Sequence, residues 1–291
     1  MQFAVLGYNN TKNIGDSIQS VAVLQHVDQD YIVIDRDNLK EYDGVSCVVV
    51  MNGWFSHQPQ NWPPSNKIKP IFFGFHITPV AADFYKYHKE YFKSYEPIGC
   101  RDLGTAETLR SWGVDAYVSG CATMTFPERA TVPVEPRDIV VDIDPFLFCR
   151  NDRRRVLSLT HESHIDYTPD TVRNQVASSL LKFYKDNAGS IVTSRIHCAM
   201  PCYAMGIPVV YCGIQEYRTK LIHDIGVPSV DFPKFWHQGL RLPKYKRLDF
   251  SVLPFVKPDY DEKKNMIARN LRGLLLSYGI KLKAWTSKEY V

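Results

Sequence analysis

Residues 190–212 read SIVTSRIHCAMPCYAMGIPVVYC and contain the pattern that decides the fold. Residues 190–193 and 209–212 are short apolar runs of the kind that form buried parallel strands, and a helix is expected between them from about Arg195. Gly206 and Pro208 separate this helix from the second run. The segment therefore predicts a strand, helix and strand unit within a parallel sheet that helices cover on both faces.

The same alternation continues toward the N-terminus. Further strands are expected at residues 3–6, 31–34, 47–51, 71–75 and 98–100. Helices are expected at residues 83–95, at residues 105–112 and around the periodic apolar positions Ile14, Ile18, Val21 and Ala22. This half of the chain thus follows the α/β pattern as well.

The C-terminal part repeats the pattern. Strands are expected at residues 139–143 and 156–159, and helices from Gln215 and over residues 262–276. Thr168 and Pro169 would begin a further helix. One face of that helix carries the apolar residues Val172, Val176, Leu180 and Phe183.

A proline-rich stretch at residues 127–136 divides the two halves, because it contains three prolines and no periodicity. We expect an N-terminal Rossmann-like domain over residues 1–128, a C-terminal one over residues 137–276 and a tail over residues 277–291. The predicted fold class is α/β, with two Rossmann-like domains facing a cleft. Ligands of such sheets bind beyond the carboxyl ends of the strands, so the residues that follow each apolar run are the candidates for a site.

Composition excludes several classes of protein. Of the 291 residues, 45% are hydrophobic and 23% charged, which is typical of a globular chain and not of a disordered one. The net charge of +4 is weaker than that of a dedicated nucleic-acid-binding protein, so no nucleic-acid partner is expected. Seven cysteines without a CxxC pair predict a reduced, cytoplasmic chain without a metal site. No signal peptide or spanning helix is evident, so membrane contact would be peripheral, at the inner face of a membrane.

The first candidate cluster is Asn13-Ile14-Gly15-Asp16, where the first strand passes into a helix. Gly15 lets a ligand approach the backbone, and the free N–H groups of the helix start attract an anion. The simpler interpretation is a capped helix with Asp16 in its first turn.

The second cluster follows three neighbouring strands. Asn52 follows residues 47–51, His76 follows residues 71–75, and Arg101 follows residues 98–100. An arginine at this edge binds a carboxylate or phosphate through two parallel bonds, or pairs with the adjacent Asp102. For His76, a structural hydrogen bond is as good an interpretation as catalysis.

The third cluster, Ser194-Arg195-Ile196-His197, follows residues 191–193 directly. Arg195 would hold an anionic donor while protonated His197 acts as a general acid. His161 and His164 follow residues 156–159 and would face the same cleft, unless they lie on a surface loop.

In combination, these motifs resemble the polysaccharide pyruvyl transferase family. The matching residues are Asn13-Ile14-Gly15-Asp16, Arg101-Asp102 with Thr105 and Leu109, and Ser194-Arg195-Ile196-His197 with Gly206-Ile207-Pro208. The resemblance implies a GT-B-like fold that transfers a pyruvyl group from phosphoenolpyruvate to a sugar as a ketal. Where many members carry Asp-Pro, this chain has Gly120-Cys121-Ala122-Thr123-Met124-Thr125, which leaves the substrate open.

The resemblance also implies roles. His197 would protonate the donor's methylene carbon, Arg195 and Arg101 would hold its carboxylate and phosphate, and His161 or His76 would accept the hydroxyl proton. We predict catalytic roles for His197, Arg195 and His161, and substrate binding by Arg101, Asn13, Asp16, Asn52, His76, His164 and Ser194. The C-terminal domain would bind the donor and the N-terminal domain the acceptor.

No cofactor is expected beyond phosphoenolpyruvate as donor substrate. The acceptor would be a sugar or lipid-linked oligosaccharide in exopolysaccharide or capsule synthesis. The alternatives are a GT-B glycosyltransferase with a nucleotide-sugar donor and a non-catalytic carbohydrate-binding protein.

Overall fold

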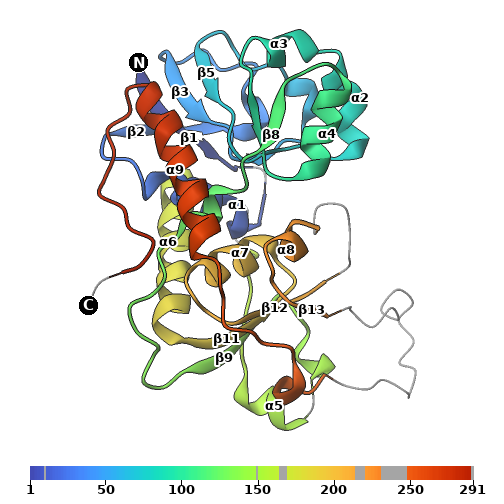
Figure 1. Ribbon diagram of the computed structural model, residues 1–291, viewed down its shortest axis with the longest axis vertical. Coiled ribbons are helices and arrows are strands. Elements are labelled where there is room, and N and C mark those ends of the chain that lie inside the picture. The colour runs from blue at the N-terminus through green and yellow to red at the C-terminus, as the bar shows by residue number, and fades with distance from the viewer. Residues whose placement is uncertain (10, 149, 164–168, 214–219, 231–247, 290–291) are drawn as a thin grey trace.

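The computed structural model describes residues 1–9, 11–148, 150–163, 169–213, 220–230 and 248–289. The chain forms two halves, each built on parallel strands with helices packed against them (Figure 1). Every pairing between the described strands of these sheets is parallel. The structure therefore confirms the predicted α/β class.

The strands of the N-terminal half lie in two consecutive sheets. One sheet has the order β2-β1-β3-β5 and the other β4-β6-β7-β8. Their bounds are β1 (Gln2–Gly7), β2 (Tyr31–Asp35), β3 (Cys47–Val50), β4 (Gly53–Trp54), β5 (Ile68–Ile71), β6 (Phe75–His76), β7 (Ile98–Cys100) and β8 (Ala116–Val118). The expected single strand at residues 71–75 is wrong. The chain breaks there because Gly74 takes a φ of +71°, and its N–H donates to Ser119 Oγ instead of a ladder partner.

The helices of this half are α1 (Ile14–Leu24), α2 (Pro79–Lys86), α3 (Lys89–Lys93) and α4 (Leu103–Ser111). The single helix expected at residues 83–95 is thus two helices. The break lies at His88, whose φ of −107° and ψ of 21° are not helical. It lets Tyr85 of α2 and Phe92 of α3 both enter the aromatic core of this half.

The C-terminal half has one sheet with the order β10-β9-β11-β12-β13. Its strands are β9 (Arg137–Val141), β10 (Leu157–Leu159), β11 (Ala188–Thr193), β12 (Val209–Cys212) and β13 (Ser229–Val230). Its helices are α5 (Arg150–Arg155), α6 (Asp170–Asn187), α7 (Ile196–Ala204), α8 (Lys220–Asp224) and α9 (Asp261–Ser277). The unit β11-α7-β12 confirms the prediction made from residues 190–212. Residues 214–219, where a helix was expected to begin, lie outside the described residues.

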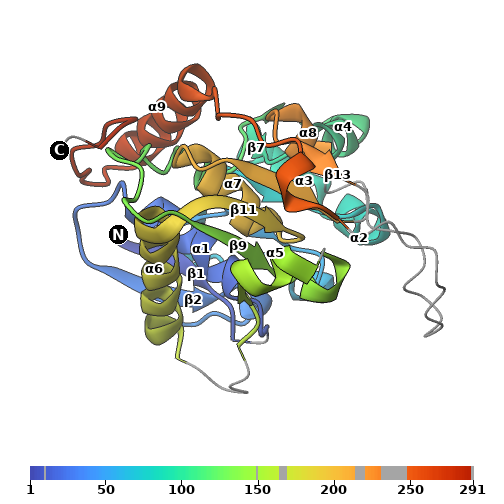
Figure 2. The same cartoon turned by 90° about the horizontal axis from the view of Figure 1, so that it is seen from below.

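The buried face of α6 differs from the apolar face expected from its sequence. Val172 and Val176 are 42% and 45% exposed, whereas Ala177, Leu181 and Tyr184 are buried. This buried face lies in the same core as Ile18 of α1, and Figure 2 shows the two helices side by side. The small side chain of Ala177 suits a close helix contact, and this packing outweighs the hydrophobicity of the valines.

One hydrophobic core joins the two halves. It contains Ile18 of α1, Ala177 of α6, Met200 of α7 and Leu271 of α9. The segment after α9 returns to the N-terminal half, where Trp285 Nε1 donates to Thr125 O at 3.0 Å. This packing holds the start of α1 against the C-terminal sheet. Among the described helices, none is long and apolar enough to span a bilayer.

Candidate functional site

Asp142 organises the carboxyl edge of the C-terminal sheet. It directly follows β9 and has a φ of +53°, a conformation that aspartate tolerates better than most residues. Its Oδ2 accepts hydrogen bonds from Arg195 Nε at 2.8 Å and from the His161 N–H at 2.9 Å. Its backbone oxygen accepts from Ser194 Oγ at 2.8 Å. Two predicted site residues, Arg195 and Ser194, are thus fastened to one aspartate.

Arg195 stands immediately before α7, as its N-cap residue. Besides Asp142, its guanidinium binds Glu162, with Nη2 2.6 Å from Oε1. The side chain remains 29% exposed, so part of the guanidinium is accessible to a ligand. Two carboxylates fix the orientation of a cation that still faces solvent.

His197 lies in the first turn of α7, against the start of α1. A Cβ atom added at Gly15 would lie 3.3 Å from His197 Cβ and 2.9 Å from Asn13 Oδ1, so only glycine fits without displacing a neighbour. Asn13 caps α1 by accepting from the Gly15 N–H at 3.0 Å. The structure therefore brings Asn13, Arg195 and His197 together at the contact between the two halves.

His161 joins the same group through its backbone, since its carbonyl accepts from the Ile14 N–H at 2.8 Å. Its ring is fully buried, and Nε2 lies 2.9 Å from the hydroxyl of Tyr184. His161 thus fastens the start of α1 to the C-terminal sheet. His164, the other histidine expected here, lies outside the described residues.

A second group lies at the edge of the N-terminal half. His76 Nδ1 is 2.5 Å from Asp102 Oδ2 and 3.1 Å from Thr105 Oγ1. Asp102 also caps α4 by accepting from the Thr105 N–H at 2.9 Å. Burial raises the pKa of Asp102, but the hydrogen bond and charge of His76 and the charge of Arg101 outweigh it, so the pKa lies below its usual value.

Arg101 is buried next to this pair, with Nε 3.9 Å from Asp102 Oδ2. The sequence suggested Arg101 as the partner of Asp102, but the much shorter contact of Asp102 is with His76. The structure thus brings Arg101 and His76 to one carboxylate.

Asp16 and Asn52 lie in other surroundings. The side-chain amide of Asn52 donates to Gln19 O at 3.2 Å, and its oxygen accepts from the Ala122 N–H at 3.4 Å. Asn52 thus links α1 to the 3-10 helix Ala122–Thr125. Asp16 is buried beside Arg36, with Oδ2 3.9 Å from Nη1. Burial raises the pKa of Asp16 although the charge of Arg36 opposes the shift.

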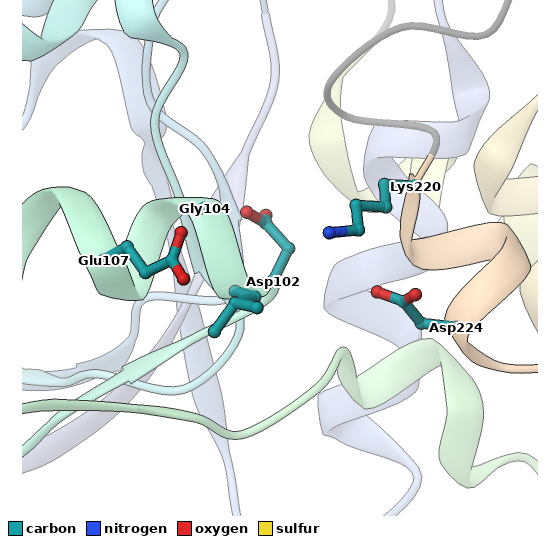
Figure 3. Close-up of a pocket in the computed structure, with 6 residues that line it drawn as sticks. Asp102, Gly104, Glu107, Lys220 and Asp224 are labelled. Atoms are coloured by element: carbon teal, nitrogen blue, oxygen red, sulfur yellow. The ribbon is translucent and has the colours of Figure 1, made fainter.

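A cavity of about 120 Å³ opens between the start of α4 and α8, so it lies between the two halves. Asp102, Leu103, Gly104, Glu107, Lys220 and Asp224 line it. Figure 3 shows the Lys220 amine extending toward the start of α4, opposite Asp102. The cavity therefore adjoins the His76 and Asp102 pair.

Sequence reasoning missed four charged residues of these edges. Asp142 was placed inside an expected strand at residues 139–143, which hid its position beyond the strand end. Arg36 and Asp37 follow β2, and the rule that directs attention to strand ends would have found them. Glu162 had no distinguishing signal, because its role depends on where Arg195 lies.

Comparison with known proteins supplies a family for this site. The family model described as polysaccharide pyruvyl transferase matches residues 13–216, a range that includes every site residue predicted above. No curated protein matches the chain significantly.

Three solved structures resemble the chain. A functionally uncharacterized protein from Klebsiella pneumoniae is 13% identical, with 79% of this chain and 92% of that chain covered and a TM-score of 0.48. A UDP-N-acetylglucosamine 2-epimerase is 12% identical, with 100% of both chains covered and a TM-score of 0.48. A lipopolysaccharide outer core galactosyltransferase is 10% identical, with 96% and 95% covered and a TM-score of 0.25.

Proposed function

Because the chain belongs to the polysaccharide pyruvyl transferase family, a family of transferases, we propose that it moves a pyruvyl group from phosphoenolpyruvate to two hydroxyls of a sugar. The products are a cyclic ketal and inorganic phosphate. The observation that carries this proposal is the pairing of Arg195 and His197 at one strand-to-helix junction. There Asp142 and Glu162 orient the arginine, and Gly15 packs against the histidine.

The donor is an anion with a carboxylate and a phosphate, so its recognition needs cations. Arg195 is partly exposed and held in position, and it would bind one of these groups through two parallel N–H bonds. Arg101, at the edge of the other half, would bind the second group. A donor held from both halves would lie with its reacting carbon in a fixed orientation, which is a large part of the rate acceleration that enzymes achieve.

The chemistry needs one acid and one base. His197 would give a proton to the methylene carbon, which becomes the methyl group of the product, while positive charge develops on the adjacent carbon. One sugar hydroxyl attacks that carbon, and the second hydroxyl displaces phosphate as the ketal closes. Each hydroxyl loses its proton, so one proton restores His197 and the other leaves with phosphate or a base.

Two histidines are candidates for the base, and their surroundings differ. His76 is bonded to the carboxylate of Asp102, which favours the protonated ring and makes the imidazole a better proton acceptor. His161 is bonded to the neutral hydroxyl of Tyr184. We therefore assign the proton to His76 and a positioning role to His161.

The acceptor is expected to be a saccharide of a polysaccharide, since the family is described by that substrate. A lipid-linked acceptor, and contact with the inner face of a membrane, stay predictions from the sequence.

The test is phosphate release from phosphoenolpyruvate in the presence of a panel of saccharides. We expect the wild type to release phosphate only when donor and acceptor are both present, and His197→Asn to lose at least about 100-fold in kcat. His88→Asn, at the break between α2 and α3, is the matched control and should keep the wild-type rate. A His197→Asn variant with wild-type turnover would remove the acid from this scheme.

A thermal-shift comparison separates this proposal from a glycosyltransferase. Phosphoenolpyruvate should raise the melting temperature, because a ligand that binds only the folded state stabilises it. Stabilisation by UDP- or GDP-sugars alone would overturn the pyruvyl donor.

A further inference from the structure

Three side chains near the start of α1 keep a buried polar atom without a hydrogen-bond partner in the described part of the chain. These atoms are Tyr8 Oη, Arg36 Nη1 and Trp54 Nε1. Tyr8 follows β1 and Arg36 follows β2, so both stand at the carboxyl edge of the sheet β2-β1-β3-β5, where parallel sheets bind ligands. Trp54 ends β4 of the other sheet, and its ring lies beside the Arg36 guanidinium.

The three residues and Asp16 form one cluster, called here the Arg36 cluster. The Arg36 guanidinium carbon lies 5.1 Å from the centre of the Tyr8 ring and 6.0 Å from that of the Trp54 ring. Arg36 Nη1 is 3.9 Å from Asp16 Oδ2. Buried donors without partners cost folding free energy, and such atoms are rare unless water or a ligand satisfies them. Several in one cluster indicate a shared missing partner.

Charge decides what kind of partner fits. Asp37 takes two hydrogen bonds from Arg36, both 2.9 Å long, and Asp16 adds a second carboxylate beside the same guanidinium. In the surroundings, Arg173 is balanced by Asp170, which accepts from the Tyr8 N–H. His57 Nδ1 also lies 3.2 Å from Asp37 Oδ2. The cluster is therefore not cationic, so it disfavours an anion such as the donor.

A neutral polyhydroxyl ligand matches the same groups. Arg36 and Trp54 supply N–H donors, Asp16 supplies an acceptor, and the Tyr8 hydroxyl serves as either. The partly exposed ring of Trp54 offers apolar surface for the C–H face of a sugar ring. We infer that the Arg36 cluster is the subsite that binds the sugar ring of the acceptor.

The location relative to the proposed acid supports this inference, which rests on the proposed function. Gly15 packs against His197, and the next residue, Asp16, faces Arg36. Both belong to the first turn of α1, so a sugar bound at the cluster would lie beside the residues assigned to the donor. The first turn of α1 thus connects the two substrates.

The polar atoms without hydrogen-bond partners allow the sugar subsite to be tested separately from the stability of the fold. Tyr8→Phe and Trp54→Phe each delete an atom that bonds to no described residue, so neither variant loses a hydrogen bond of the fold. The matched control is Tyr85→Phe, whose hydroxyl donates to Phe55 O in the aromatic core of the same half. Urea unfolding should show a loss of stability for the control only.

The measurement is phosphate release from phosphoenolpyruvate with a panel of methyl glycosides of hexoses and N-acetylhexosamines. For Tyr8→Phe and Trp54→Phe we expect the KM of the glycoside to rise about fivefold to tenfold, the effect of one lost hydrogen bond. The donor KM and kcat should stay within about twofold, and Tyr85→Phe should leave both KM values unchanged. A purely structural role would not separate the two KM values.

The outcomes distinguish this inference from the proposed function. If the wild type is active and both variants keep its glycoside KM, the missing partner is internal water and the subsite is refuted. If the wild type releases no phosphate with any glycoside, the pyruvyl transfer is refuted. In that case thermal shifts with the same glycosides decide about the subsite. Stabilisation that Tyr8→Phe weakens would uphold it, and no stabilisation of the wild type would refute it.

Discussion

Replacement of Asp142 tests whether one carboxylate holds the site of the C-terminal half together. Asp142→Asn keeps the side-chain shape and the tolerance for a φ of +53°, but it removes the charge that Arg195 Nε and the His161 N–H face at 2.8 and 2.9 Å. Asp142→Gly removes the side chain and relieves the backbone. Asp142→Ala removes the side chain and keeps the strained φ.

The expected sizes follow from the contacts. A hydrogen bond to a charged group contributes about 1.5–3 kcal/mol, and the lower end applies because Arg195 is 29% exposed and solvent screens its charge. Asp142→Asn should therefore lower the free energy of unfolding by about 1.5 kcal/mol. If the loss of the fixed Arg195 orientation raises the activation free energy by about 2 kcal/mol, kcat/KM falls about 30-fold. Asp142→Ala should be about 1 kcal/mol less stable than Asp142→Gly, because alanine disfavours a positive φ.

Urea unfolding and phosphate release from phosphoenolpyruvate measure both effects. Asp138→Asn is the matched control, since Asp138 lies on the same strand and accepts from Ser190 Oγ at 2.7 Å, toward the opposite end of β9. It should change activity less than about twofold. Wild-type kcat/KM in Asp142→Asn, or equal stability of the alanine and glycine variants, would refute the role assigned to Asp142.

Two further predictions concern buried histidines. Asp102→Asn should lower kcat about 100-fold, because it removes the carboxylate charge beside His76. A plot of kcat against pH should also lose the limb that the base produces. A pH profile of kcat equal to that of the wild type would contradict the assignment of His76 as the base. Burial, with a smaller effect of Arg272, lowers the pKa of His26 to about 3, so this ring stays neutral in the folded state while the unfolded chain binds a proton below about pH 6.5. The contribution of neutral His26 to stability is therefore complete above pH 6.5 and declines as the pH falls. Between pH 6.5 and 5 the free energy of unfolding in urea should fall by about 2 kcal/mol more for the wild type than for His26→Gln. Equal decreases in the two proteins would contradict the lowered pKa of His26.

Local pattern predicted many elements of the fold correctly. The runs at residues 98–100 and 209–212 are the strands β7 and β12, and the last helix differs from its expected range by one residue at each end. Such elements depend on hydrophobic period and on Gly and Pro, which neighbouring residues encode. The errors lie where tertiary packing prevails, as at the buried face of α6 and at the break of residues 72–74.

The candidate site, like the fold, was predicted from the sequence only in part. Strand ends directed attention to Arg101, Arg195 and His197, because ligand-binding residues of parallel sheets follow their strands. The partners that give these residues their chemistry were not evident. His76 lies 26 residues before Asp102, and Asp142 lies 53 residues before Arg195, so no local pattern relates them.

The sequence by itself determined that the chain forms parallel sheets covered by helices, and that cations and imidazoles stand at the strand ends. Only the tertiary structure decided which of these groups meet. It joined His76 to Asp102 and fastened Arg195 to Asp142 and Glu162, and it left polar atoms of the Arg36 cluster without a partner among the described residues. The physical reason is that periodicity arises from contacts a few residues apart, whereas hydrogen bonds and charge pairs act through space. The pKa values and orientations of these side chains therefore depend on neighbours that folding brings from distant parts of the chain.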